Sequence, residues 1–380
     1  MMDATLLPKI ANLAEVERVV GKPLPTLDAI QQAGYHLVKA RDREEYYLAK
    51  ETDLPPLLVR LGDVAEVRFG IKTGANEFFY LEPVGLRVAD IVAGKAGERV
   101  QVRNGAGWQG EIETAWLRPV IKSPRELKTL RVRPEDLRYL VLMPPDEARH
   151  RLHDTAYLQR QFPHAWAYIQ WGERQGYQYN PTCAARILWW CVEPLPAPYV
   201  LIPQFFRQIP HITYNPGGFP TDHTFYFALV DESVEQSVDK EELLVALLCS
   251  SMTYIFTDII GRTNQSGLIT FYGPEWKQLP IPNPAAFTDT QRERLLNAFE
   301  QMAGREVKSI FEELGLPKPN RNYSNIHPEE VSLERVLPDR RALDAVVFEV
   351  LGLSEAEQLD VYRAVVELVK SRLVRAQCVG

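Results

Sequence analysis

Residues 61–81 (LGDVAEVRFGIKTGANEFFYL) restrict the fold more than any other segment of this chain. A run typical of a β-strand leads into a loop bracketed by Gly70 and Gly74, and a second strand-like run follows. The two glycines allow a sharp turn and a close approach of the backbone to a ligand. The loop presents three polar side chains: Lys72, Thr73 and Asn76. The segment predicts two strands joined either by a plain hairpin turn in water or by a ligand-binding loop.

The residue types in this loop suit a nucleic acid. Lys and Thr side chains bind phosphate oxygens, and Asn can make two hydrogen bonds to an adenine edge. The whole chain carries 43 Lys and Arg against 50 Asp and Glu, a net charge of −7, which excludes binding by bulk basicity. Residues 118–160 nevertheless hold ten basic and six acidic residues. This stretch is either an ordinary solvated face or a local basic surface.

Short strand-like runs fill the middle of the chain, separated by Gly and Pro residues. These runs are residues 64–69, 78–81, 199–202, 211–214 and 224–230. A single helical pattern over residues 240–260 interrupts them and stops at Gly261. The pattern predicts an α+β fold, with an irregular mixed sheet followed by a helical C-terminal region.

The two ends of the chain differ from this middle part. Residues 1–58 hold two short helical patterns and predict a connector or arm, whereas residues 286–380 are helical. After a capping box at residues 354–357, the last helix carries an apolar seam. The seam consists of Leu359, Tyr362, Val366, Val369 and Leu373. It packs either on a helix of the same chain or on a partner, so we divide the chain into residues 1–58, 59–285 and 286–380.

Cysteine usage indicates a reducing compartment. The four cysteines form no C-x-x-C pair, the histidines are too scattered for a zinc site, and a disulfide framework would be too sparse. We therefore expect reduced thiols and a cytoplasmic protein. The N-terminus has no signal-peptide pattern. The longest apolar stretch, residues 243–260, contains Ser, Thr and Asp, which favours a buried helix over a membrane span.

Three common catalytic motifs are absent from the sequence. It contains no G-x-S-x-G, P-loop or H-E-x-x-H. Asp222, Glu275 and Lys277 have the residue types of a nuclease in which two carboxylates hold Mg²⁺ and a lysine orients the attacking water. Asp222 lies 53 positions before Glu275, and the pair Glu-x-Lys is common by chance, so this nuclease remains an alternative function. A protein-interaction scaffold is a second alternative.

Residues 61–81 resemble the opening of the target-recognition domain in TaqI-type adenine-specific DNA methyltransferases. Further segments resemble the same family in the same order: WLRPVIKSPREL at 116–127, PTCAARILWW at 181–190, LLCSS at 247–251, Gly261-Arg262, RALD at 341–344, LGL at 351–353 and Arg372-Leu373. The resemblance runs from about Leu61 to the end of the chain. It implies a sequence-specific module that recognises double-stranded DNA and works with a catalytic methyltransferase domain or subunit.

The resemblance also suggests roles for particular residues. The expected phosphate contacts come from the basic stretch: Lys122, Ser123, Arg125 and Lys128. The expected base-edge contacts come from the Lys72–Asn76 loop and from a second polar run: Arg262, Thr263, Asn264 and Gln265. Arg262 is alternatively a helix cap. Arg186 is either a reader or a buried structural arginine stacked on aromatic rings.

Family members also carry an upstream catalytic domain, with a glycine loop for S-adenosylmethionine and an NPPY-type tetrapeptide that grips a flipped adenine. The three Asn-Pro pairs here begin at residues 180, 215 and 283 and continue with Thr, Gly and Ala, so none reads NPPY. The first 60 residues are too short for a cofactor-binding sheet. We therefore expect no catalytic residue, metal site or cofactor in this chain, and S-adenosylmethionine in the catalytic partner. Such a chain is a separate specificity subunit or part of a longer enzyme, in a restriction–modification or phage-defence system.

Overall fold

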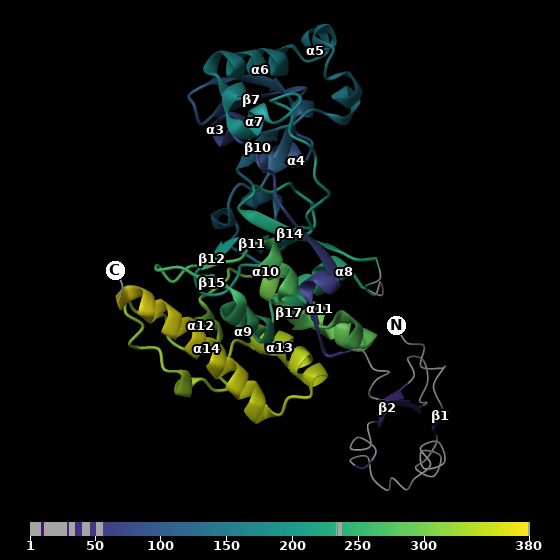
Figure 1. Ribbon diagram of the computed structural model, residues 1–380, viewed down its shortest axis with the longest axis vertical. Coiled ribbons are helices and arrows are strands. Elements are labelled where there is room, and N and C mark those ends of the chain that lie inside the picture. Colours follow the sequence, from purple (N-terminus) through teal and green to yellow (C-terminus); the bar gives the residue numbers. More distant parts are fainter. Residues whose placement is uncertain are drawn as a thin grey trace.

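The computed structural model describes residues 56–232, 234 and 238–378, together with residues 9–10, 29, 35–39 and 46–50. These residues form an elongated molecule with two lobes joined by a narrow junction (Figure 1). The upper lobe consists of residues 72–198, and the lower lobe consists of residues 56–71 and 199–378. Most of the arm expected over residues 1–58 lies outside the described residues. Three short strands in it form one antiparallel sheet: β1 (Lys9–Ile10), β2 (Tyr35–Lys39) and β3 (Tyr46–Lys50).

The upper lobe is built on a five-stranded antiparallel sheet in the order β8-β7-β6-β10-β9. Its strands are β6 (Tyr80–Pro83), β7 (Arg99–Asn104), β8 (Gln109–Glu113), β9 (Leu117–Val120) and β10 (Tyr139–Leu142). Its helices are α3 (Asn76–Phe79), α4 (Val88–Val92), α5 (Thr155–Gln161), α6 (Pro163–Gln175) and α7 (Pro181–Ala184). Strand β7 alternates exposed and buried residues along its whole length, because one face of the sheet packs on the core.

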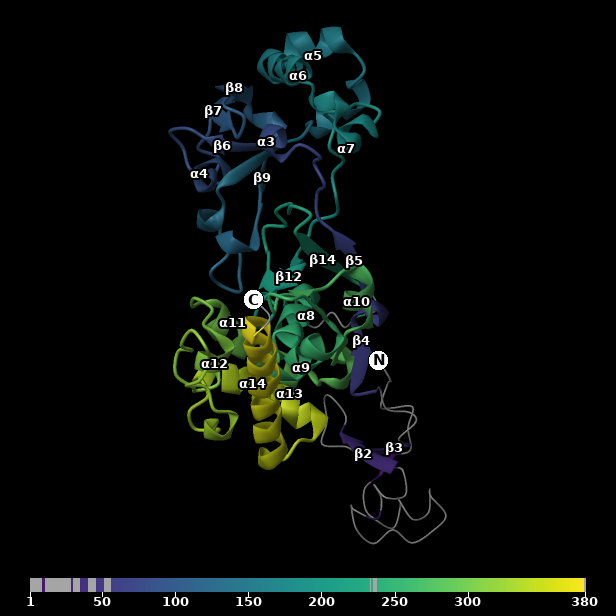
Figure 2. The same ribbon diagram turned by 60° about the vertical axis from the view of Figure 1, so that its left-hand side comes forward.

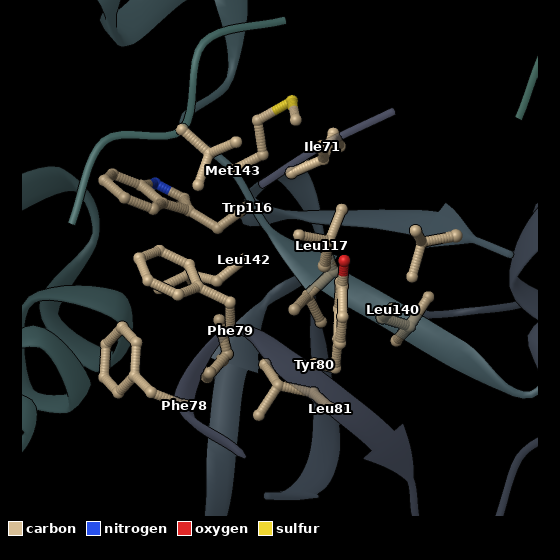
Figure 3. Packing of buried hydrophobic residues seen from close by; sticks show 14 of the residues in the cluster. Ile71, Phe78, Phe79, Tyr80, Leu81, Trp116, Leu117, Leu140, Leu142 and Met143 are labelled. Carbon is tan, nitrogen blue, oxygen red and sulfur yellow. The ribbon is translucent and has the colours of Figure 1, made fainter. Parts of the chain in front are cut away.

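Aromatic rings fill the core between this sheet and α6. The rings of Phe78 and Tyr168 stack with centroids 4.6 Å apart, and Trp189 packs 5.0 Å from Phe78. The Tyr168 hydroxyl donates to the backbone carbonyl of Phe78 and accepts from the Asn104 amide. Figure 3 shows the rings of Phe78, Phe79 and Trp116 gathered beside the strands. This packing fixes α3, and with it the loop that precedes α3.

A second antiparallel sheet, in the order β13-β11-β14-β5, lies at the junction. Its strands are β5 (Ala65–Phe69), β11 (Val200–Pro203), β13 (Thr213–Tyr214) and β14 (Phe225–Val230). The hairpin considered for residues 61–81 is therefore wrong. Strand β5 pairs with β14, whereas β6 pairs with β7 and β10 in the other sheet. The intervening loop connects two lobes instead of two neighbouring strands.

The lower lobe surrounds the junction sheet with smaller sheets and helices (Figure 2). Its remaining strands are β4 (Leu58–Arg60), β12 (Phe205–Phe206), β15 (Arg262–Thr263), β16 (Ile269–Thr270) and β17 (Pro280–Pro282). Its helices are α8 (Lys240–Leu248), α9 (Ser251–Ile260), α10 (Gly273–Gln278), α11 (Asp289–Ala303), α12 (Ile310–Glu313), α13 (Pro338–Leu351) and α14 (Glu355–Cys378). Single 3₁₀ turns link many of these elements: Leu61–Asp63, Thr114–Trp116, Pro124–Glu126, Pro134–Asp136, Asp146–Arg151, Tyr177–Tyr179, Pro284–Ala286 and Pro328–Glu330. The predicted α+β fold class is confirmed.

The single helix predicted over residues 240–260 is wrong, because α8 and α9 meet at an angle of 67°. The Ser250 hydroxyl accepts a hydrogen bond from the Thr253 amide and caps α9, which makes a new helix start favourable there. In the described part of the chain, no single helix is long and apolar enough to cross a membrane. Only the bent pair of α8 and α9, taken together, has the length and apolar composition of a membrane span among the described residues.

The apolar seam of α14 packs inside the same chain. Tyr362, Val366, Val369 and Leu373 are each no more than 2% exposed, and α14 lies against α9. The preceding helices α11 and α13 share one core with α8 and the junction sheet. Residues on both sides of the division expected at 285–286 therefore pack together.

A buried ionic cluster fastens α13 to the α8–α9 turn. The Arg340 guanidinium is 1% exposed and donates to the Glu313 carboxylate at 2.8–2.9 Å and to the Cys249 carbonyl. Asp344 accepts from the Ser251 amide and hydroxyl at 2.8 and 2.6 Å. Each charge in this cluster is balanced by a partner, which is the condition under which buried charges are tolerated.

We expect Arg340→Ala to lower the free energy of unfolding by about 3–5 kcal/mol, because it leaves the buried carboxylate of Asp344 without a cation and Glu313 with Arg305 alone. Urea denaturation followed by circular dichroism measures this loss. The matched control is Arg294→Ala, since Arg294 pairs with Glu349 at 2.9 Å but both side chains are nearly half exposed. That control should lose less than about 1 kcal/mol. Equal losses in the two variants would contradict the role given to the cluster.

Candidate nucleic-acid interface

The predicted Lys72–Asn76 loop runs from the junction into the upper lobe, and its residues divide into two groups. Thr73 is fully buried, and its hydroxyl accepts from the Ala75 amide at 3.2 Å and bonds to the Asn76 side chain. The Asn76 amide nitrogen lies 3.5 Å from the Asp222 carboxylate. Lys72 is exposed, and within the described residues its ammonium has no hydrogen-bond or ion-pair partner. Lys72 is thus available to a ligand, whereas Thr73 shapes the loop.

Arg186 fastens this loop from behind. Its guanidinium donates to the carbonyls of Lys72 and Thr73 at 2.6 and 2.8 Å and to the Trp189 carbonyl at 3.1 Å. It also lies 5.4 Å from the Phe79 ring centroid. This is the structural arginine considered as one of the two alternatives. Its donors face main-chain carbonyls, so they are already used by the protein.

The two glycines allow segments of the same chain to pack closely against each other. A Cβ at Gly70 would lie 2.4 Å from the Asp222 carbonyl oxygen, and a Cβ at Gly74 would lie 2.5 Å from the Thr182 Cβ. Gly74 also has a φ of +80°, a left-handed conformation that costs little for glycine. The space that the sequence suggested for a ligand beside these glycines is filled by the junction segment at Gly70 and by α7 at Gly74.

Asp222 lies inside the junction. It is 1% exposed, accepts from the Tyr80 hydroxyl at 2.7 Å and from the Thr224 amide at 2.9 Å, and its backbone bridges to Ile71. Burial raises the pKa of Tyr80, which keeps the phenol protonated as the donor. Asp222 therefore has the bonding of a structural carboxylate.

The residues of the nuclease alternative do not form a metal centre. Glu275 pairs with Arg262 and accepts from the Tyr272 amide at the start of α10, away from the partners of Asp222. Among the residues that the structure describes, no group of three or more His, Cys, Asp or Glu side chains could hold a metal ion. Cys183, Cys191 and Cys249 are free and buried, and the side chain of Cys378 lies outside the described atoms.

The basic stretch follows β9 and descends from the upper lobe towards α11. The Lys122 ammonium lies 4.3 Å from the centroid of the Tyr139 ring, a cation–π contact, and the Ser123 hydroxyl accepts from the Arg125 amide at 3.3 Å. Arg125 is exposed, and the exposed side chains of Lys128 and Glu306 form an ion pair at 3.7 Å. Arg125 is therefore the most accessible of the four predicted phosphate contacts.

Glu126 lies within this stretch and has a perturbed protonation equilibrium. Burial raises the pKa of its carboxyl group to about 7, although backbone amides of Ser123 and Lys122 and the charge of Arg138 act in the opposite direction. Its Oε2 is buried and has no hydrogen-bond partner in the described structure. Sequence reasoning gave Glu126 no role, since a glutamate in a charged stretch gives no sign of burial.

The second polar run forms the β15–β16 hairpin of the lower lobe. The Asn264 side-chain oxygen accepts from the Ser266 and Leu268 amides at 3.0 and 3.1 Å and closes the turn. Arg262 pairs with Glu275 and lies 5.5 Å from the Tyr272 ring centroid, while Thr263 and Gln265 are exposed. The hairpin belongs to a different lobe from the Lys72–Asn76 loop, so the two predicted reading elements do not form one loop cluster.

A cleft of about 570 Å³ opens beside Lys72, between the end of β5 and residues 186–195. Phe69 and Ile187 on its walls are 57% and 93% exposed, and Arg149 and His153 also line it. Sequence reasoning missed Arg149 and His153 as neighbours of Lys72. The fold of the upper lobe brings these residues to the same cleft, and no spacing in the sequence predicts this arrangement.

Charge is divided unequally between the lobes. The upper lobe has 17 Lys and Arg against 14 Asp and Glu, whereas the rest of the chain has 26 against 36. Two of these cations, Lys128 and Arg131, pair with carboxylates of the lower lobe, so Lys72 and Arg125 lie in a part of the protein that is less acidic than the rest. Such a distribution permits local attraction of a polyanion despite the negative total.

Comparisons with known proteins found a matching family and a similar solved structure. The sequence model described as "Type II methyltransferase M.Eco57I, C-terminal domain" matches residues 113–314, more than half of the chain. No curated protein matches. Among solved structures, a type IIG restriction endonuclease, BpuSI, is similar over 84% of this chain, with 13% identity and a TM-score of 0.48. The matched part covers 31% of the BpuSI chain.

We expect Arg186→Ala to loosen the Lys72–Asn76 loop, because three carbonyls lose their donor. Hydrogen–deuterium exchange should become faster at the amides of Ala75, Phe78 and Phe79, which bond within the loop and α3. Arg174→Ala, at an exposed position on α6, is the control and should leave these amides protected. Unchanged exchange in the Arg186 variant would contradict the fastening role.

Glu126 should make stability depend on pH. Its folded-state pKa of about 7 lies above the ordinary value of 4.5, so its contribution is fully present below about pH 4.5 and is lost as the pH rises through 7. We expect Glu126→Gln to remove about 2–3 kcal/mol of pH dependence between those limits. Urea midpoints measured across this range test the prediction, with Glu135→Gln as an exposed-turn control. Parallel pH profiles for wild type and Glu126→Gln would refute it.

Proposed function

Because the chain belongs to the family of type II methyltransferase M.Eco57I C-terminal domains, we propose that it recognises the DNA sequence at which a methyltransferase acts. This family places the chain in DNA methyltransferases of restriction–modification, in their target-recognition region. In the proposed mechanism the chain binds double-stranded DNA and positions a catalytic domain or subunit. That catalytic domain flips and methylates an adenine.

One observation carries this proposal: an unpartnered, exposed Lys72 on a fastened loop of the basic upper lobe. A preorganised cation of this kind can bind a phosphate without first being released from a protein partner. Arg186 supports the loop through main-chain carbonyls, so the base or phosphate contacts are left to Lys72 and its neighbours. Arg125, in the turn that follows β9, adds a second accessible cation.

The chemistry of methyl transfer belongs to the partner in this proposal. S-adenosylmethionine binds the catalytic domain, and the chain described here supplies sequence selection as a specificity subunit or as one region of a longer enzyme. The setting is restriction–modification or phage defence in the cytoplasm. Methyl transfer from labelled S-adenosylmethionine to DNA by this chain alone would contradict the division of labour.

The acidic total predicts weak and salt-sensitive binding by the chain alone. Each neutralised phosphate releases condensed counterions, so the logarithm of the binding constant falls by about 0.9 per phosphate for each unit of log salt. A basic catalytic domain would add further phosphate contacts. Gel-shift titrations with and without the methyltransferase partner should therefore differ most at moderate salt.

We expect Lys72→Ala to weaken DNA binding and to reduce the salt slope by about 0.9, because one phosphate contact is lost. Fluorescence anisotropy with a labelled duplex of random sequence, titrated at several salt concentrations, measures both quantities. Lys95→Ala is the matched control: Lys95 is exposed in the same lobe but pairs with Asp90 at 3.3 Å. If both variants have the wild-type slope, Lys72 is not a phosphate contact.

A further inference from the structure

The C-terminal end of α14 lies beside β12 in the lower lobe (Figures 1 and 2). A hollow of about 750 Å³ includes Gln377 from this end of α14. Five residues line it: Arg207, Asn320, Arg321, Asn322 and Gln377. All five are exposed and polar, and no carboxylate is among them. Within the described structure, the guanidinium groups of Arg207 and Arg321 have no hydrogen-bond or ion-pair partner. The polar hollow thus presents two free cations with three amide side chains.

The backbone beneath these side chains is fixed by α14. The buried Arg372 guanidinium donates to the Arg207 and Gly267 carbonyls at 2.6 Å each and pairs with Asp258 at 2.8 Å. Gln377 donates to the Arg321 carbonyl at 2.6 Å. These bonds use only the main-chain oxygens of Arg207 and Arg321, so their guanidinium groups stay available to a ligand. Arg207, Arg321 and the β15–β16 hairpin are therefore held in one framework.

A second hollow lies beside the hairpin. It measures about 320 Å³ and is lined by Thr263, Asn264 and Gln265 together with Arg375 near the end of α14, and its lining also includes the carboxylate of Asp258, which pairs with Arg372, and the apolar side chains of Leu368 and Ala376. Arg375 is exposed and uses its Nε to donate to the Ser371 carbonyl at 3.1 Å. Both hollows therefore border the last turns of α14, one beside the predicted reading hairpin and the other beside the free arginines.

The chemistry of the larger hollow fits the phosphate backbone of a nucleic acid. Guanidinium groups bind phosphate oxygens through paired N–H donors, and amide side chains add further donors. Protein interfaces, in contrast, depend on buried aromatic or apolar anchors, and the five residues of the larger hollow include none. Residues 286–380 have 13 basic and 16 acidic residues, so an anion is attracted to them only at such a local cation cluster.

We propose that Arg207 and Arg321 bind phosphates of a DNA duplex, so that the DNA interface includes the lower lobe beside the end of α14. This inference rests on the proposed function of the chain. The hairpin of residues 262–268 lies beside the bound backbone, with Gln265 and Thr263 nearest to the duplex. The tail therefore has two roles: it packs the lower lobe and it contributes cations to the interface.

The test uses the full chain and a labelled duplex of random sequence, with anisotropy titrations over a series of salt concentrations. Neutralising both residues in Arg207→Gln/Arg321→Gln should reduce the salt slope by about 1.8, because two phosphate contacts are lost. Arg207→Lys/Arg321→Lys keeps both charges and should retain most of the wild-type slope. The matched control, Arg294→Gln, neutralises an exposed arginine outside the hollow and should bind as wild type does.

Three results are decisive. A reduced slope in the Gln pair alone, with unchanged thermal unfolding, supports the proposal. A wild-type slope in the Gln pair, while Lys72→Ala still weakens binding, overturns this inference and leaves the proposed function standing. Absence of DNA binding by the wild-type chain at low salt, alone and with its catalytic partner, overturns the proposed function and this inference together.

Discussion

The junction between the lobes determines where every candidate contact lies. Ile71 and Ile121, which lead out of β5 and β9, both pair with the segment around Thr221 and Asp222. The Tyr80 hydroxyl then reaches back from the upper sheet to the buried Asp222 carboxylate at 2.7 Å. A buried carboxylate with these donors is costly to expose or to leave unpaired, so the two sheets keep one relative position. Lys72 leaves this junction after β5 and the basic stretch leaves it after β9, a strand of the other sheet, so their spacing follows from the junction.

Arginine has two distinct uses in this protein, and residue type alone does not separate them. Arg186, Arg340 and Arg372 each donate to main-chain carbonyls and hold together segments that are distant in the sequence. Arg125, Arg207 and Arg321 are exposed. The planar guanidinium suits both uses because its five donors can satisfy several carbonyls at once or grip a phosphate through two oxygens. The structural arginines make the positions of the exposed cations definite, and a definite position lowers the entropy lost on binding.

Local patterns in the sequence predicted much of the secondary structure, and pairing over long distances explains what they missed. The strand β5, the capped start of α14 and the buried seam of that helix follow from periodicity and capping residues. The pairing of β5 with β14 depends on residues more than 150 positions apart, which no local pattern encodes. The bend between α8 and α9 was equally hidden, since Ser250 reads as an ordinary residue of an apolar helix until its cap is seen. For the candidate site, residue type suggested Lys72 and Arg125, but burial of Thr73 and the carbonyl contacts of Arg186 required the fold.

If the chain has the proposed DNA-recognition function, the division of charge between the lobes bears on how strong unselective binding is avoided. A uniformly basic chain would bind any duplex tightly, because phosphate contacts carry no sequence information. Here the excess of acid outside the upper lobe opposes such binding, and a few accessible cations on a rigid framework offset it only where the geometry of the duplex fits. In the proposed function, discrimination among bases depends on exposed polar groups such as Gln265, which become effective when the phosphates are already in register. The rigidity of the junction and of the Arg372 contacts therefore contributes to selectivity as much as the reading side chains do.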